Sequence, residues 1–120
     1  MAGLSAYTLP KAERISGRES VSALVDKGHH LVQGCLKCRF LSDNGLGYSR
    51  IMVSVPKRNF KRAVKRNLIR RRIRESYRLN KQALGPGFDV LFYYAEKEVL
   101  TFEAICADMV EALKSISGGK

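Results

Sequence analysis

The chain has 120 residues, of which 45% are hydrophobic, and a formal net charge of +11 at pH 7. That length suits one domain with a modest core and is too short for two. No apolar run approaches membrane-spanning length, and the N-terminal residues lack the charged and apolar regions of a signal peptide. Three cysteines, an odd number, fit reduced thiols better than a disulfide framework, so we expect a cytoplasmic protein.

The first predicted helix covers residues 17 to 27, after an irregular arm that contains Pro10. Ser16 and Glu19 have the spacing of a capping box at its start. Its apolar stripe consists of Val21, Leu24 and Val25. Gly28 is able to close the helix in a left-handed conformation.

Two strands are predicted next, Leu31 to Phe40 and Tyr48 to Val55. In the second strand, Ile51, Val53 and Val55 alternate with Met52 and Ser54, which is the period of a half-buried strand. The residues between the strands, Ser-Asp-Asn-Gly-Leu-Gly, tolerate positive φ angles. We therefore expect the two strands to form an antiparallel hairpin.

The stretch from Lys57 to Lys81 carries the whole formal net charge, because the rest of the chain is neutral. It holds 12 of the 22 Lys and Arg residues and one of the 11 acidic residues, Glu75. Like charges this close together repel one another, so a basic run of this density indicates a polyanionic partner.

From Ala63 onward this stretch predicts a helix with two faces. The stripe that faces a core consists of Ile69, Ile73 and Tyr77. A different face, suited to phosphates, carries Asn67, Arg71, Arg74 and Arg78. A second apolar row contains Phe60, Val64 and Leu68. Either the helix starts late and Phe60 belongs to a loop, or Leu68 is partly exposed.

The last third of the chain predicts a strand and a helix. Gly85-Pro-Gly interrupts the chain, and Phe88 to Tyr94 forms the third strand. Thr101 is the expected N-cap of the last helix. The inner face of that helix consists of Phe102, Ile105, Met109, Leu113 and Ile116.

Together these elements predict an α+β fold, a two-layer α/β sandwich with the order α-β-β-α-β-α. We expect a single domain over residues 1–120, with flexible ends at 1–12 and 117–120. The strands on either side of the basic helix can pair in parallel through a β-α-β crossover, which is right-handed in nearly all such units.

The basic stretch also carries a specific motif. Val55-Pro-Lys-Arg is followed, after a short spacer, by Ala63-Val-Lys-Arg-Asn-Leu-Ile-Arg-Arg-Arg-Ile-Arg-Glu. This run resembles the signature of the bacterial ribonuclease P protein subunit, V-[SA]-K-K, a spacer, and A-x-x-R-N-R-I-K-R-x-x-R-E. Leu68 replaces the second Arg of the family's R-N-R. Lys11 to Ile15 and Lys27-Gly28 resemble the family's opening element, in which Val21 and Val25 stand where Phe is usual.

The resemblance implies a left-handed crossover and a protein without catalytic groups of its own. In ribonuclease P, the large RNA subunit holds the catalytic metals and cleaves the 5′ leader from precursor tRNA. The protein subunit docks on that RNA and holds the leader in a cleft beside its sheet. The expected partners are therefore ribonuclease P RNA and precursor tRNA, with neither DNA nor a membrane. The protein itself is expected to bind no cofactor, although the RNA-dependent reaction requires Mg²⁺.

The candidate site residues form two groups. The signature and the basic stretch assign RNA binding to Lys57, Arg58, Lys61, Arg62, Lys65, Arg66, Asn67, Arg70, Arg71, Arg74 and Arg78. The N-terminal pattern adds Arg14, and a leader cleft is assigned to Arg14, Arg39, Phe40 and Tyr48. An aromatic ring beside a cation can stack a base while the cation holds its phosphate, although packing in the core or a hairpin explains Phe40 and Tyr48 equally well. Glu75 is interpreted as bracing a neighbouring Arg.

The chain shows no catalytic constellation. Hydrolysis of a phosphodiester usually needs metal-binding carboxylates, and no pair of them lies beside the basic stretch. Asp89 is interpreted as bracing the start of its strand. Cys35 and Cys38 have metal-ligand spacing that His29, His30 and Cys106 could complete. A strand, however, points positions i and i+3 to opposite faces, so we interpret these thiols as small buried side chains.

Two other classes of protein fit a small basic chain. A ribosomal or other structural RNA-binding protein would bind RNA without promoting cleavage of precursor tRNA. A DNA-binding module would place the basic helix in the major groove, but here the Arg residues surround much of the helix and no dimerisation element is evident. A metal-dependent nuclease is a third and more distant alternative.

Overall fold

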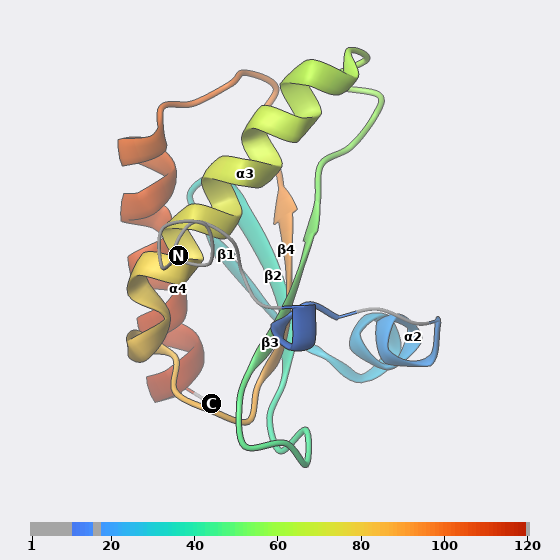
Figure 1. The fold of residues 1–120 in the computed structure, drawn as a ribbon, viewed down its shortest axis with the longest axis vertical. Coiled ribbons are helices and arrows are strands. Elements are labelled where there is room, and N and C mark those ends of the chain that lie inside the picture. Colours follow the sequence, from blue (N-terminus) through green and yellow to red (C-terminus); the bar gives the residue numbers. More distant parts are fainter. Residues whose placement is uncertain (1–10, 16–17, 120) are drawn as a thin grey trace, which may run out of the picture.

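The structure is a computed structural model that describes residues 11–15 and 18–119. Its elements are η1 (Lys11–Glu13), α2 (Arg18–Lys27), β1 (His29–Gln33), β2 (Leu36–Leu41), β3 (Arg50–Ser54), α3 (Ala63–Asn80), η2 (Lys81–Ala83), β4 (Asp89–Tyr94) and α4 (Phe102–Gly119) (Figure 1). The expected flexible end at 117–119 is part of α4. The predicted capping residue Ser16 lies outside the described residues.

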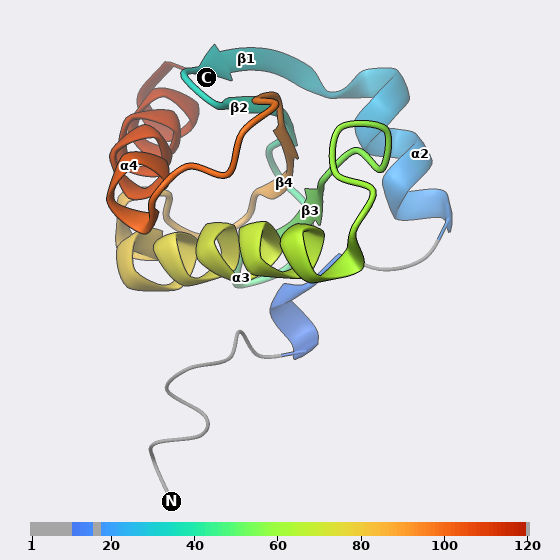
Figure 2. The same ribbon diagram turned by 90° about the horizontal axis from the view of Figure 1, so that it is seen from above.

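The four strands form one sheet in the order β1-β2-β4-β3. The pairs β1–β2 and β2–β4 are antiparallel, and β3–β4 is parallel. Helices α3 and α4 cover one face of the sheet, and α2 lies on the other side from α4 (Figure 2). This arrangement confirms the predicted α+β sandwich, with one strand more than the sequence suggested.

The expected hairpin between the first two predicted strands is wrong. Residues 31–40 are divided by a turn at Gly34, which has a φ of 55°, so that β1 and β2 form the hairpin themselves. The next turn does use positive φ angles, at Asp43 (58°) and Gly45 (79°). It leads to β3, however, which β4 separates from β2 in the sheet. Gln33-Gly34, which interrupts the apolar residues on either side, was the available signal for this turn.

The crossover from β3 through α3 to β4 is left-handed. In Figure 1, β3 and β4 both run upward, α3 lies in front of them, and the path moves from β3 on the right to β4 on its left. Figure 2 shows the same arrangement from above. The resemblance therefore predicted the handedness that the general preference for right-handed crossovers did not.

The core lies between the sheet and the pair α3–α4. Alternate residues of the two central strands face it, and their register places Leu36 opposite Tyr94 and Cys38 opposite Phe92. All four side chains are at most 1% exposed. Of the predicted inner face of α4, Ile105, Met109, Leu113 and Ile116 are buried and Phe102 is half-buried. Thr101 caps that helix, because its Oγ1 accepts a hydrogen bond from the Ala104 N–H at 3.2 Å.

The end of α2 differs from the expectation. The Gly28 N–H donates to the Leu24 carbonyl at 3.0 Å, but its φ is not among the positive ones. Glycine suits this position for a steric reason, since a Cβ atom here would lie 2.3 Å from the Leu24 oxygen.

No helix in the described part of the chain is long and apolar enough to span a bilayer.

Candidate nucleic-acid interface

Helix α3 has the two faces that its sequence predicted. Ile69, Ile73 and Tyr77 are at most 1% exposed and face the core. Asn67 and Arg71 are exposed on the outer side, where Arg74 is half-buried. Both explanations of the second apolar row hold, because Phe60 lies buried in the loop before the helix and Leu68 is partly exposed. Val64, from the same row, is 77% exposed.

Most cations of the basic stretch have no acidic partner. Arg78 pairs with Glu75, whose Oε1 accepts from the Arg78 Nε at 3.1 Å, and this confirms the bracing role of Glu75. Within residues 11–15 and 18–119, no ion pair involves Lys57, Arg58, Lys61, Arg62, Lys65, Arg66, Arg70, Arg71, Arg72 or Arg74. Their charges are therefore available to an external anion.

Several of these side chains also stabilise the surroundings of the helix. The Arg66 guanidinium donates to the carbonyls of Phe60 at 2.7 Å and Lys61 at 3.0 Å, and so holds the loop that leads into α3. Arg70 donates to the Asn67 Oδ1 at 3.0 Å, which fixes both side chains on one surface. Arg72 instead donates to the Leu100 carbonyl, on the side of α4.

The N-terminal residues bring one more cation to α3. The Ile15 N–H donates to the Ile51 carbonyl at 2.8 Å, and Arg14 forms a parallel bridge with Ile51. Lys11–Ile15, here called the N-terminal strap, thus lies along the edge of the sheet. Burial, followed by the nearby charges of Arg14 and Arg70, lowers the pKa of Arg74. Arg14 thus joins two like charges of α3 on one surface, although it is distant from them in the sequence, and a polyanion stabilises such an arrangement.

A second basic surface surrounds the start of α3. A hollow of about 420 Å³ lies there, lined by Asn59, Phe60, Lys61, Arg62, Lys65, Lys97, Glu98 and Val99. The first turn of α3 contains no acidic residue, and the N-cap Arg62 makes no side-chain capping bond within the described chain. The free backbone N–H groups and the helix dipole add to the positive potential of this hollow.

The open face of the sheet has a hollow of about 340 Å³. It is lined by His30, Leu31, Val32, Lys37, Cys38, Arg39, Leu91 and Tyr93. Arg39 is therefore placed as a cleft residue would be, and its Nη1 also donates to the Val25 carbonyl at 2.7 Å. Lys37 and Tyr93, which are register partners in β2 and β4, were missed by the sequence. The alternation of Phe92, Tyr93 and Tyr94 was the available signal.

Three residues assigned to this cleft, Arg14, Phe40 and Tyr48, are not among those that line it. Arg14 lies in the N-terminal strap, beside Ile51 of β3. Phe40 is 6% exposed and faces the core, with its ring centroid 5.4 Å from that of His29. Its assignment to a base-stacking surface is wrong, because neighbouring residues of a strand point to opposite faces. Tyr48 is 38% exposed but lines a different hollow, near the end of α3.

The other candidate groups have structural roles. Asp89 accepts from the Arg50 Nε at 3.0 Å and pairs with its Nη2 at 2.6 Å, which confirms its bracing role. Cys35 and Cys38 are 1% exposed, and burial raises the pKa of each thiol to about 12. Among the residues that the structure describes, no group of three or more His, Cys, Asp or Glu side chains is placed to hold a metal ion.

Known proteins share both the sequence and the fold. The family model for ribonuclease P matches residues 9–117. The ribonuclease P protein component of Porphyromonas gingivalis is 32% identical, with 93% of this chain and 88% of that protein covered. The component from Thermotoga petrophila is 31% identical, over 90% of this chain and 95% of the relative.

Solved structures give the same result. The ribonuclease P protein of Thermotoga maritima superposes with a TM-score of 0.78 at 28% identity, and 88% of this chain and 99% of that one are covered. The Staphylococcus aureus protein superposes with a TM-score of 0.74 at 25% identity, over 87% and 94% of the two chains. The motif in α3, the sandwich fold and these matches together establish that the chain belongs to the ribonuclease P protein family.

Proposed function

We propose that this chain is the RNA-binding subunit of ribonuclease P and assists removal of the 5′ leader from precursor tRNA in the cytoplasm. It binds the catalytic RNA subunit through the cationic surface of α3 and the leader on the open face of the sheet. The RNA subunit and its Mg²⁺ ions carry out the hydrolysis. The protein contributes binding and orientation.

The observation that carries this proposal is the convergence of unpaired cations on α3. The pKa of Arg74 is lowered first by burial and then by the charges of Arg14 and Arg70, which both lie near it. Repulsion among these cations does not stabilise the folded protein. When a phosphate backbone binds, each cation is instead attracted to a phosphate, so the electrostatic energy of the cluster becomes favourable. The basic hollow at the start of α3 extends the same surface toward Lys61 and Lys65.

The open face of the sheet supplies what a single strand needs. Tyr93 offers a partly exposed ring, and Lys37 and Arg39 lie beside it on β2. Stacking on an aromatic ring tolerates any base, and nearby cations hold the phosphates. We therefore expect leader binding by this face to depend little on the base sequence of the leader.

The deciding experiment uses precursor tRNA and a bacterial ribonuclease P RNA at low Mg²⁺ concentration, with and without the protein. We expect RNA-free protein to cleave nothing, and the protein to accelerate cleavage by the RNA. Arg71→Ala should reduce the acceleration, whereas Lys114→Ala, which removes an exposed cation from α4, should not. RNA binding without any acceleration would instead indicate a structural RNA-binding protein, and cleavage by highly purified protein alone would refute the proposal.

A further inference from the structure

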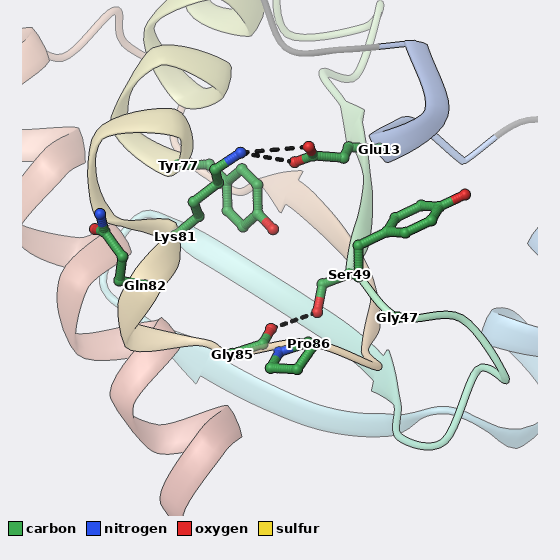
Figure 3. A pocket seen from close by; sticks show the side chains of 9 residues that line it. Glu13, Gly47, Ser49, Tyr77, Lys81, Gln82, Gly85 and Pro86 are labelled. Atoms are coloured by element: carbon green, nitrogen blue, oxygen red, sulfur yellow. Dashed lines mark hydrogen bonds and ion pairs between the residues drawn. The ribbon is translucent and has the colours of Figure 1, made fainter.

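A third hollow lies at the other end of α3, beside the loops that precede β3 and β4 (Figure 3). It has a volume of about 200 Å³, and its lining includes Glu13, Tyr48, Tyr77 and Lys81. It shares no lining residue with the open-face hollow or with the hollow at the start of α3. Ligand pockets for larger molecules span about 300–1,000 Å³, so this hollow suits a single ring system.

The hydroxyl group of Tyr77 points into this hollow (Figure 3). Tyr77 is 1% exposed, and its ring packs against Phe92 with centroids 6.3 Å apart. No hydrogen bond of this hydroxyl is described within residues 11–15 and 18–119, and it does not count among fully buried polar atoms that lack a partner. It can therefore donate to or accept from a polar ligand in the hollow. Burial and the charge of Glu13 raise the pKa of Tyr77 to about 12, so the phenol remains a neutral donor.

A carboxylate and an ammonium group line the same hollow. The Lys81 Nζ is 3.0 Å from the Glu13 Oε1 and 3.3 Å from its Oε2. The two side chains are only 19% (Glu13) and 38% (Lys81) exposed. Each carboxylate oxygen accepts more than one hydrogen bond and the ammonium donates three, so the ion pair keeps capacity for a ligand.

The hollow adjoins the cationic surface assigned to RNA. Glu13 precedes Arg14 in the N-terminal strap, and Tyr77 follows Arg74 by about one helical turn. An RNA strand whose phosphates contact Arg14 and Arg74 therefore passes the mouth of the hollow. Glu13 repels phosphate itself, so the part of the RNA that fits inside is an uncharged base.

We propose that this hollow binds one unstacked guanine base of the RNA, an inference that rests on the proposed RNA-binding function. The Watson–Crick edge of guanine presents a carbonyl acceptor next to two N–H donors. The two donors match the two oxygens of Glu13, and the carbonyl accepts from Lys81 or Tyr77. Adenine has a single donor group beside an acceptor and lacks this match. The partly exposed Tyr48 lines the same hollow and offers a ring to the base.

The test measures binding of the whole protein to short, fluorescently labelled oligouridines by anisotropy. Each RNA carries one central guanine, inosine, adenine or abasic site. We expect guanine to bind about tenfold more tightly than adenine or the abasic site. Inosine, which lacks the 2-amino group, should lie between them.

Three variants separate this hollow from the rest of the interface. Tyr77→Phe and Glu13→Gln should each remove most of the preference for guanine. Tyr77→Phe should melt like the original chain, because it removes a hydroxyl with no described hydrogen bond. Arg71→Ala should weaken binding of all four RNAs by the same factor and keep the preference.

The outcomes distinguish the inference from the proposed function. If all four RNAs bind with equal affinity, the inference fails and RNA binding stands. A preference for adenine also overturns it, as does early melting of Tyr77→Phe. If none of the RNAs binds at low salt, the proposed function itself fails.

Discussion

A side chain at position 34 would strain the backbone and would also clash with the carboxylate of Asp108. The φ of Gly34 is 55°, and a Cβ atom there would lie 2.3 Å from the Asp108 Oδ2. That oxygen accepts a hydrogen bond from the Cys35 N–H at 2.9 Å, so Asp108 cannot move away without a loss. This single position thus ties the β1–β2 hairpin to α4.

We therefore predict that Gly34→Ala destabilises the domain by at least about 1–2 kcal/mol, the cost of a left-handed conformation for a residue with a Cβ atom. Urea unfolding measures the change. Gly47→Ala is the matched control, because a Cβ there would have no atom within 4 Å. Equal stability of the two variants would show that the turn at Gly34 tolerates a side chain.

At the scale of the element, the two faces of α3 have different roles: the inner face stabilises the fold and the outer face is available for binding. Its inner face is buried against the sheet and α4, while its outer face carries cations without acidic partners in the described chain. Neighbouring residues in the sequence therefore have opposite roles. Arg71 is exposed, and Ile73, two positions later, is 0% exposed.

Arg71→Ala and Arg74→Ala should each weaken assembly with RNA by about 1–3 kcal/mol and leave the fold intact. Ile73→Ala should lower the free energy of unfolding by about 2–5 kcal/mol, through lost burial and a cavity. Thermal melting and RNA affinity, measured together for all three variants, check both statements. Early melting of the two Arg variants with normal RNA affinity would mean that the faces of the helix are assigned wrongly.

At the scale of the whole molecule, the charge makes RNA binding depend on salt. If about six to eight phosphates are neutralised, the slope of log K against log salt concentration should be about −4 to −6, at roughly −0.7 per contact with single strands. Titrations of RNA binding over a range of KCl concentrations measure it. A nearly flat dependence would exclude the cationic surface of α3 as the main contact.

The buried thiols and Tyr77 make stability depend on alkaline pH. The pKa of Cys35 and of Cys38 rises from 9.0 to about 12 in the folded state, mainly through burial, and that of Tyr77 rises from 10.0 to about 12. Between pH 9 and 12 the unfolded chain therefore releases protons that the folded chain keeps. The free energy of unfolding should thus be unaffected by these groups below pH 9 and fall above it.

Urea unfolding from pH 7 to 10.5 tests this dependence. The double variant Cys35→Ala/Cys38→Ala should show a shallower decline above pH 9, whatever its stability at pH 7. Identical declines for the variant and the original chain would mean that the thiols titrate in the folded state as they do in the unfolded one.

The sequence alone determined the local elements and the main function-bearing surface. The stripe of Ile69, Ile73 and Tyr77, the Thr101 cap and the inner face of α4 all follow from contacts within one helix or from its periodicity. The cationic face of α3 follows in the same way, because its residues are neighbours on one helix. The motif within it was specific enough to indicate the family that the comparisons confirm.

Only the tertiary structure decided which segments meet. Alternation along a strand shows that one side is buried but not which strand lies beside it, since backbone hydrogen bonds form between any two extended segments. The insertion of β4 between β2 and β3 therefore escaped the sequence, and with it the open-face hollow of Lys37, Arg39 and Tyr93. The approach of Arg14 to Arg74, and the pairing of Glu13 with Lys81, escaped it for the same reason. These residues lie 60 and 68 positions apart in the sequence, and a pattern confined to one segment carries no record of their contacts.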